Sequence, residues 1–313
     1  MSQRIPFVAF AVSALLFLGS AGASPCLADF VNLGTANQYA LLGIDSADLD
    51  FGSSVTVNGS VGVANLGSLE FMAAHSRING NVYAQDLSSV TGPGTITGSH
   101  VQMSLAQAVA DALNASNTDR TLAAGVTINT AVTKAQTFTS VNSGVTYDGK
   151  NVTVIDINGN INLHDANITL SGTPSDYFLI NVAGHLNLTG TASLLVGGTL
   201  PINNVLWNFT GGDAANPGQK MFSTQDGAVV DGTFLAPYYT ITLNGTANGA
   251  IIGGSSDDNV FSSATINGTG HAFASDPPLA NPAPPSIVLF GLGSIGFAGL
   301  VARSRRRRAA AAA

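Results

Sequence analysis

The side chains that could carry chemistry in this chain are five histidines, one cysteine and scattered carboxylates. The sequence lacks the HExxH pattern of zinc-binding helices, and no two histidines stand four residues apart. A single cysteine, Cys26, cannot form an intramolecular disulfide or a cysteine-rich metal site. The sequence therefore predicts no metal and no other cofactor. We expect surface or turn positions for the histidines, which are His75, His100, His164, His185 and His271.

Two aspartates are the best candidates for catalysis. Enzymes that cleave polysaccharides need two carboxylates, or a carboxylate and a base, held close together. Asp156 and Asp165, with His164 beside the second, are the best-placed group. They fit equally well as solvent-facing turn residues, and the basic residues of the body are widely dispersed. We therefore expect a protein that is not an enzyme and has no catalytic residues.

Two acidic clusters could supply oxygen ligands to calcium. Neither matches a twelve-residue EF-hand loop or a glycine-rich nonapeptide repeat. We interpret both as solvated turns. The clusters are Asp45, Asp48 and Asp50, and Asp257, Asp258 and Asn259.

The elements that would position such residues are short strands. In the stretch 154–196, β-branched and leucine-rich runs alternate with polar residues, as in Ile161 and Leu163 or Ile168 and Leu170. Glycine-containing phrases break these runs, and glycine accepts the positive φ of a sharp turn. Neighbouring phrases often lie about 18 to 23 residues apart, which is a solenoid period. Further copies stand at 57–61, 78–82, 96–99, 188–191, 243–246 and 266–269.

One segment has helical rather than strand periodicity. Between 104 and 116, Leu105, Ala108 and Ala112 fall on one apolar stripe, together with Val109 and Leu113. Ser104 and Gln107 have the spacing of a capping box at the start of a helix. The sequence thus predicts a mainly β solenoid with one α-helix, at about 104–116, packed along its side.

Composition and charge indicate one folded, acidic body. The 313 residues are 45% hydrophobic and 9% charged, which excludes a disordered chain. Apart from Arg4 and the arginines near the C-terminus, the chain has five Lys and Arg against 18 Asp and Glu. Because nucleic-acid binding needs basic patches, we expect no nucleic-acid partner.

The N-terminus has the three parts of a secretory signal peptide. Arg4 precedes an apolar run at 5–18 and a small-residue stretch at 19–23. The run is too short for a membrane-spanning helix. We expect a signal helix at 1–28 that signal peptidase removes after Ala28, or alternatively after Ala23. A second alternative is a lipoprotein acylated on Cys26.

The C-terminus has the layout of a sorting tail. A proline-rich linker at 276–286 leads to an apolar segment with four glycines, basic residues up to 308, and alanines at 309–313. The apolar stretch is marginal for a permanent span, and its arginines would stay cytoplasmic. The tail at 287–308 with its linker resembles a PEP-CTERM sorting signal, with Ala283 in place of the usual glutamate. The matching residues are Pro282, Ala283, Pro284, Arg305, Arg306, Arg307 and Arg308.

This resemblance implies a route of export. It implies processing by an exosortase in a Gram-negative bacterium, transient anchoring in the inner membrane by a short transmembrane-type helix, and delivery to the cell surface or beyond. An ordinary single-span anchor is the alternative. Both place the body, 29–275, outside the cytoplasm.

The body resembles the ice-binding-like β-helix family over 33–273. The resemblance rests on the opening LGTANQYALL, the phrase GSVGV, the lone helix, and strands with NVLW and GTFLA. The phrases around Trp207 and Pro237 are also similar to the choice-of-anchor A domain, a second exported module. The family resemblance implies a right-handed β-helix with the helix packed alongside.

Three pairs of threonines could form a binding surface. Alternate residues of a strand share one face, so each Thr-x-Thr phrase presents two hydroxyl and methyl groups outward. A flat face of this kind could order water to match an ice lattice, although threonine is also common at exposed strand positions. The candidate surface residues are Thr95, Thr97, Thr137, Thr139, Thr240 and Thr242.

Two functions follow from these observations. The first is a structural or adhesive surface protein that contacts extracellular polysaccharide or another surface ligand. The second is an ice-binding protein that uses a threonine-bearing face. A carbohydrate-active enzyme is a third and weaker hypothesis.

Overall fold

The computed structural model describes residues 33–147, 150–216, 218–225, 227–254 and 259–268. The predicted signal peptide, proline-rich linker and sorting tail lie outside these residues. Within the described part of the chain, no helix has the length and apolar character of a membrane span.

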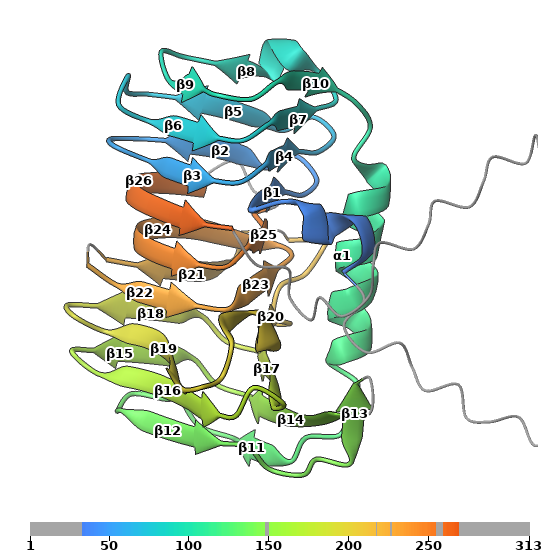
Figure 1. Cartoon of the computed structure of the whole chain (residues 1–313), viewed down its shortest axis with the longest axis vertical. Helices are drawn as coiled ribbons and strands as arrows, with labels where there is room; N and C mark the ends of the chain where they lie inside the picture. The colour runs from blue at the N-terminus through green and yellow to red at the C-terminus, as the bar shows by residue number, and fades with distance from the viewer. Residues whose placement is uncertain (1–32, 148–149, 217, 226, 255–258, 269–313) are drawn as a thin grey trace, which may run out of the picture.

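The described residues form a β-solenoid whose coils contribute up to three strands each, one to each side (Figure 1). The helix face stacks β10 (His100–Gln102), β7 (Val82–Ala84), β4 (Val61–Val63), β1 (Leu41–Gly43), β25 (Ile251–Gly253), β23 (Thr233–Ala236), β20 (Val205–Phe209), β17 (Tyr177–Val182), β14 (Lys150–Ile157) and β11 (Val126–Ile128). All these neighbours are parallel, and only β13 (Val145–Tyr147) joins this sheet antiparallel, against β14.

The other two sides belong to one sheet that bends within its two longest strands, β24 (Tyr239–Asn248) and β26 (Asn259–Asn267). The mixed face stacks β8 (Val90–Thr91), β5 (Ser68–Phe71), β2 (Asp48–Phe51), the first parts of β26 and β24, β21 (Lys220–Thr224), β18 (Leu186–Thr189) and β15 (Ile161–His164). The Thr-x-Asn face stacks β9 (Thr95–Ile96), β6 (Arg77–Asn79), β3 (Thr56–Asn58), the second parts of β26 and β24, β22 (Val229–Asp231), β19 (Ser193–Gly198), β16 (Asn167–Gly172) and β12 (Gln136–Thr139).

The coils do not follow one another in sequence order. The chain begins in the middle of the stack with β1, β2 and β3, winds to one end, and crosses to the other end along α1 (Ala106–Asp119) (Figure 1). It then winds back from β11 until its last coil meets its first. Leu41 pairs with Ile251, and Thr56 pairs with Thr265. Short 3-10 turns lie at Gly34–Gln38, Leu87–Ser89 and Ile202–Asn204.

Two apolar clusters hold this arrangement together. One fills the interior of the solenoid, where Phe51 packs edge-to-face between Phe71 and Phe261 on adjacent coils, with ring centroids 5.5 Å apart in each pair. The other lies between α1 and the helix face, and includes Leu42, Leu179 and Leu206. The alternating pattern of the strands is confirmed, because Ile161, Leu163, Ile168 and Leu170 all point inward.

The helix differs in detail from the expectation. It spans 106–119 rather than about 104–116, and Ala108, Ala112 and Ala115 form its buried stripe, with Val109 and Leu113 only partly buried. The expected capping box is wrong in its second half. The Ser104 hydroxyl accepts a hydrogen bond from the Ala106 N–H, but the Gln107 amide donates to Asp111 Oδ1. Small residues on the buried stripe let the helix lie close to the sheet.

Glycine has two different roles at the corners. Gly59 has a φ of 139°, as the sequence predicts for a sharp turn. Gly80, on the next coil, does not need a positive φ, but a Cβ at this position would clash with the carbonyl oxygen of Gly59. Glycine at Gly80 therefore permits successive coils to approach each other, which the expectation based on φ alone did not include.

Candidate functional site

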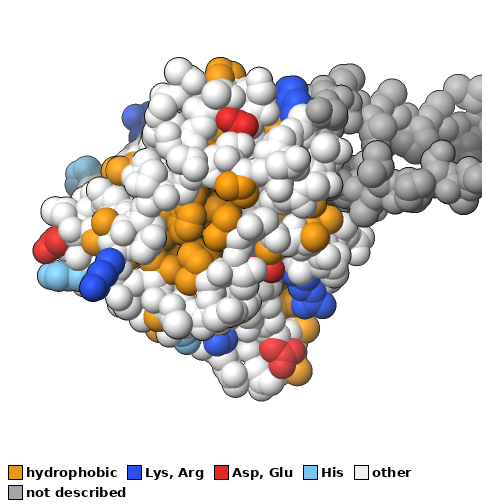
Figure 2. Space-filling model, turned by 90° about the horizontal axis from the view of Figure 1, so that it is seen from below, with side chains coloured by type: hydrophobic (Ala, Val, Ile, Leu, Met, Phe, Trp, Pro, Cys, Tyr) orange, Lys and Arg blue, Asp and Glu red, His pale blue; other side chains and the backbone are white. Residues whose placement is uncertain are grey.

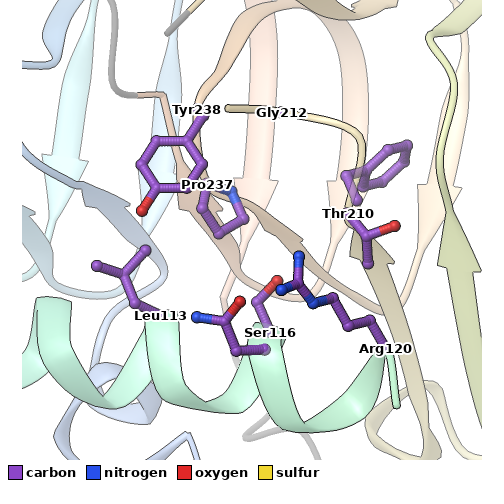
Figure 3. A pocket seen from close by; sticks show the side chains of 9 residues that line it. Leu113, Ser116, Arg120, Thr210, Gly212, Pro237 and Tyr238 are labelled. Carbon is purple, nitrogen blue, oxygen red and sulfur yellow. The ribbon is translucent and has the colours of Figure 1, made fainter. Parts of the chain in front are cut away.

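The described structure has a small hollow beside α1 and a wider one at an end of the solenoid. A hollow of about 20 Å³ between α1 and the loops around 210 and 237 holds roughly one water (Figure 3). Arg120, Thr210 and Tyr238 line it. A wider hollow of about 310 Å³ lies at the end of the solenoid that β11 and β12 form, lined by Ile128, Val132 and neighbouring residues. Figure 2 shows apolar side chains gathered at the centre of that end, where no further coil covers the interior.

The structure does not bring the candidate catalytic carboxylates together. Asp156 lies on β14 in the helix face, where it accepts a hydrogen bond of 3.0 Å from Asn181 Nδ2. Asp165 lies at the corner between β15 and β16 with a φ of 52°. A hydrogen bond from the Thr191 backbone N–H is the main cause that lowers the pKa of Asp165. The Thr191 hydroxyl and the nearby His164 lower it further, with smaller effects. The His164 Nε2 to Asp165 Oδ2 distance is 3.2 Å, but both side chains are exposed.

Residues of the two acidic clusters take part in hydrogen bonds that hold the fold together. Asp48 accepts hydrogen bonds from the backbone N–H and the hydroxyl of Ser68 on the next coil. Asn259 is fully buried and accepts the Ile241 N–H, while Asp257 and Asp258 lie outside the described residues. Among the residues that the structure describes, no three His, Cys, Asp or Glu side chains gather as metal ligands would.

The mixed face carries an irregular set of outward side chains. Thr240 and Thr242 lie here, and Thr240 pairs in register with Met221, which is 47% exposed. Acidic and apolar residues interrupt the hydroxyl groups along this face. One column, read across the stack, consists of Asn162, Asn187, Ser223, Thr242, Val260, Asp50, Glu70 and Thr91.

The Thr-x-Asn face is more regular. Thr246, Thr265 and Thr56 stand in register on three neighbouring strands, and the same column continues through Arg77 to Thr95. The residue that follows each of these first three threonines, such as Val57 after Thr56, points into the core. Neighbouring parallel strands lie roughly 4.8 Å apart, so the three threonines present hydroxyl groups at a constant repeat.

An asparagine ladder runs beside the threonine column. Each side-chain amide donates to the next across adjacent coils, at 2.8 Å or 2.9 Å. The ladder ends on Asp231, which also accepts the Val196 N–H. A carboxylate can only accept, so Asp231 fixes which way every amide points. In order from donor to acceptor the ladder is Asn79, Asn58, Asn267, Asn248 and Asp231.

The threonines selected from the sequence are spread over two faces. Thr95 lies on β9 at one end of the Thr-x-Asn face, and Thr97 follows it with its hydroxyl bonded to the Ile78 carbonyl. Thr137 and Thr139 lie on β12 at the opposite end, paired with Thr169 and Ser171. These two groups and the Thr240 and Thr242 pair therefore do not form one patch.

Sequence reasoning missed the three threonines at the centre of the face. Their signal was present as the repeated phrase Thr-x-Asn at 56–58, 246–248 and 265–267. A Thr-x-Thr phrase places two threonines on one strand, whereas this array is built from one Thr-x-Asn phrase on each of three neighbouring strands.

Charge is distributed unequally between the sides. The strands of the Thr-x-Asn face contain only two charged residues, Asp231 and Arg77. Asp231 is 8% exposed and hydrogen-bonded, whereas Arg77 is exposed. The acidic residues Asp48, Asp50 and Glu70 lie on the mixed face. The Thr-x-Asn face is thus less acidic than the mixed face.

The fold and its open faces define a class of protein, a β-solenoid flanked by one helix that offers flat surfaces rather than a deep pocket. The chain belongs to the family described as putative ice-binding-like adhesive domain, whose sequence model matches residues 30–266. The resemblance of the body to ice-binding-like proteins is therefore confirmed. No curated protein matches the chain significantly.

Solved structures of ice-binding proteins share this fold. The protein LeIBP from an Arctic yeast is 18% identical, with a TM-score of 0.56, 79% of this chain covered and 96% of that one. The ice-binding protein of the Antarctic ascomycete Antarctomyces psychrotrophicus is 20% identical, with a TM-score of 0.50 and coverages of 75% and 96%. The ice-binding protein of an Antarctic Flavobacteriaceae bacterium is 20% identical, with a TM-score of 0.52, and 75% of this chain matches 47% of that longer one.

Proposed function

We propose that this chain is a non-enzymatic surface protein that adheres to extended, hydrated polymers such as extracellular polysaccharide through its Thr-x-Asn face. The observation that carries the proposal is the register of Thr246, Thr265 and Thr56 beside the asparagine ladder. A flat array with a constant repeat suits a ligand that itself repeats hydroxyl groups over a length. The family description as an adhesive domain supports the same function.

The remaining geometry favours adhesion over catalysis. Asp156 lies on the helix face, Asp165 lies at the corner between the other two faces, and the hollow beside α1 holds about one water. Incubation of the protein with diverse polysaccharides should release no reducing or unsaturated ends, and release of either would overturn the non-enzymatic assignment.

Delivery to the surface is the second part of the proposal. Its support comes from the sequence: the signal peptide at 1–28 for signal peptidase, and the tail from Pro282 to the arginines at 305–308 for an exosortase-type enzyme of a Gram-negative bacterium. The tail would hold the chain in the inner membrane transiently. We also propose the right-handed winding that the family resemblance implies.

Adhesion can be tested with a matched pair of variants. The triple variant Thr56→Ala, Thr246→Ala and Thr265→Ala removes the hydroxyl column, and Thr240→Ala with Thr242→Ala removes two hydroxyls from the mixed face. In a binding screen against immobilised polysaccharides, the triple variant should bind about tenfold or more weakly, because several hydrogen bonds are lost together. The double variant should bind as the unmodified chain does. Equal binding by all three proteins would reject the Thr-x-Asn face as the adhesive surface.

Ice binding is the second candidate function. The threonine column and the likeness of the fold to ice-binding proteins favour it. Arg77 interrupts the column, which is unfavourable for matching an ice lattice. The test is thermal hysteresis and inhibition of ice recrystallisation by the purified chain. Activity that Thr265→Tyr abolishes would support ice binding, and no activity at high protein concentration would reject it.

A further inference from the structure

We infer that Arg77 makes the Thr-x-Asn face selective for acidic polysaccharides by binding the carboxylate of a uronic acid residue. This inference rests on the proposed adhesive function and names the class of polymer that the face takes. It follows from the position of Arg77, the open end of the asparagine ladder and the distribution of charge.

The first observation is the position of the guanidinium. Arg77 takes the place of a threonine in the hydroxyl column, with Thr56 on one side and Thr95 on the other. Its side chain is exposed, and none of the described carboxylates forms an ion pair with it. A planar guanidinium can bind both oxygens of a carboxylate at once, so this position offers a charged anchor inside a row of hydroxyl groups.

The second observation is the free end of the ladder. Asn79 donates to Asn58 Oδ1, but among the described residues no coil beyond it supplies an amide to its own Oδ1. Arg77 and Asn79 are two residues apart on β6, so they lie on the same side at a distance of roughly 7 Å along the strand. Arg77 can thus hold a carboxylate while Asn79 Oδ1 accepts a sugar hydroxyl. An acidic sugar carries both groups.

The third observation is electrostatic. The chain carries 18 Asp and Glu, nearly all of them in the body, and these would repel an acidic polymer from most of its surface. The strands of the Thr-x-Asn face contain one acidic residue, Asp231, which is nearly buried and accepts hydrogen bonds from Asn248 and Val196. An acidic polymer therefore meets less repulsion here than on the mixed face, where Asp50 and Glu70 stand side by side.

The test measures binding of the full chain to alginate, a uronate polymer, and to dextran, a neutral polymer. All proteins carry serine at 305–308, so that the arginine cluster near the C-terminus does not contribute. The variants are Arg77→Thr, Arg77→Lys and, as a matched control, Arg120→Thr, which replaces an exposed arginine just after the last residue of α1. We expect Arg77→Thr to raise the Kd for alginate at least tenfold and to leave dextran unchanged. Arg77→Lys should recover part of the affinity, and added salt should weaken alginate binding only when a cation is present at 77.

The outcomes separate this inference from the proposed function. Unchanged alginate binding by Arg77→Thr, or an equal loss with Arg120→Thr, would overturn the role of Arg77. If Arg77 proved to have no such role but the threonine triple variant lost dextran binding, adhesion through the Thr-x-Asn face would stand without selectivity for acidic polymers. If the triple variant bound both polymers normally, the adhesive face itself would be rejected. Dextran sulfate bound more tightly than alginate would show that sulfate, not the uronate carboxylate, is the preferred anion and would also overturn the inference.

Discussion

Asn58 Nδ2 donates a hydrogen bond of 2.8 Å to Asn267 Oδ1, although 209 residues separate the two in sequence. This bond joins the first coil of the chain to the last one. It is one step of the ladder that ends on Asp231. The donor-to-acceptor direction that this carboxylate sets for the amides therefore continues across the junction. The same junction carries Thr56 and Thr265, which places the centre of the proposed adhesive face where the two halves of the chain meet.

Breaking the ladder at the junction should destabilise the fold. Asn58→Ala leaves Asn267 Oδ1 and Asn79 Nδ2 without their partners, which should cost about 1 to 3 kcal/mol because unsatisfied amide groups lose their bonds. Asn58→Asp should cost more, since an acceptor would then face the Asn267 acceptor. Urea unfolding measures the difference, with Asn187→Ala on the mixed face as the control. A loss of stability no larger than that of the control would contradict this account.

The attachment of α1 should depend on a buried pair of polar residues. Ser116 Oγ donates to Asn208 Oδ1 at 2.7 Å, and Asn208 Nδ2 donates back to the Ser116 carbonyl at 3.1 Å. Asn208 is fully buried, so Ser116→Ala should lower the free energy of unfolding by about 1 to 2 kcal/mol. Asn114→Ala, at an exposed position of the same helix, should change it little. Hydrogen exchange of the helix amides should be faster in Ser116→Ala than in Asn114→Ala. Equal exchange rates in the two variants would argue against the Ser116 contact.

Close stacking of the coils should make one glycine intolerant of substitution. Gly80→Ala places a Cβ against the Gly59 carbonyl, so the coils must separate and stability should fall by more than about 3 kcal/mol. Gly144→Ala meets no atom within 4 Å and suffers only from a φ of 74°, so it should cost about 1 kcal/mol. Thermal unfolding compares the two variants. Similar melting temperatures would mean that the coil spacing is less tight than the structure shows.

Stability should depend on pH through His185. Its Nδ1 accepts the Met221 N–H at 3.0 Å, and burial, with a smaller effect of Lys220, lowers the pKa of His185 below its ordinary value of 6.5. A lowered pKa in the folded state means that the stabilisation is present above pH 6.5 and is lost as pH falls toward the folded pKa. Urea unfolding between about pH 8 and about pH 5 should show this loss.

His185→Asn is the matched variant for that titration. An asparagine Oδ1 can accept the Met221 N–H without taking up a proton, so the fall in stability over this pH range should become smaller. His75→Asn, which replaces an exposed histidine, should leave the fall as it is in the unmodified chain. An unchanged profile in His185→Asn would assign the pH dependence to another group.

The sequence by itself determined the secondary structure and the general fold. Apolar alternation at Ile161 and Leu163 can be satisfied only by a strand with one buried side, and the periodic glycines indicate stacked coils. The helical stripe at Ala108 and Ala112 is equally local. These features depend on neighbours within a few residues, so periodicity reveals them. Residue types alone also led to the three Thr-x-Thr pairs, which describe single strands.

Only the tertiary structure decided which coils are neighbours. The chain starts in the middle of the stack, and α1 carries it from one end to the other, so Thr56 meets Thr265 rather than a residue of the adjacent repeat. No local pattern encodes this order, because the same inward and outward alternation would serve any order of stacking. The side-chain pairs that the order creates, from Asn79 to Asp231, therefore became visible only once the coils were placed.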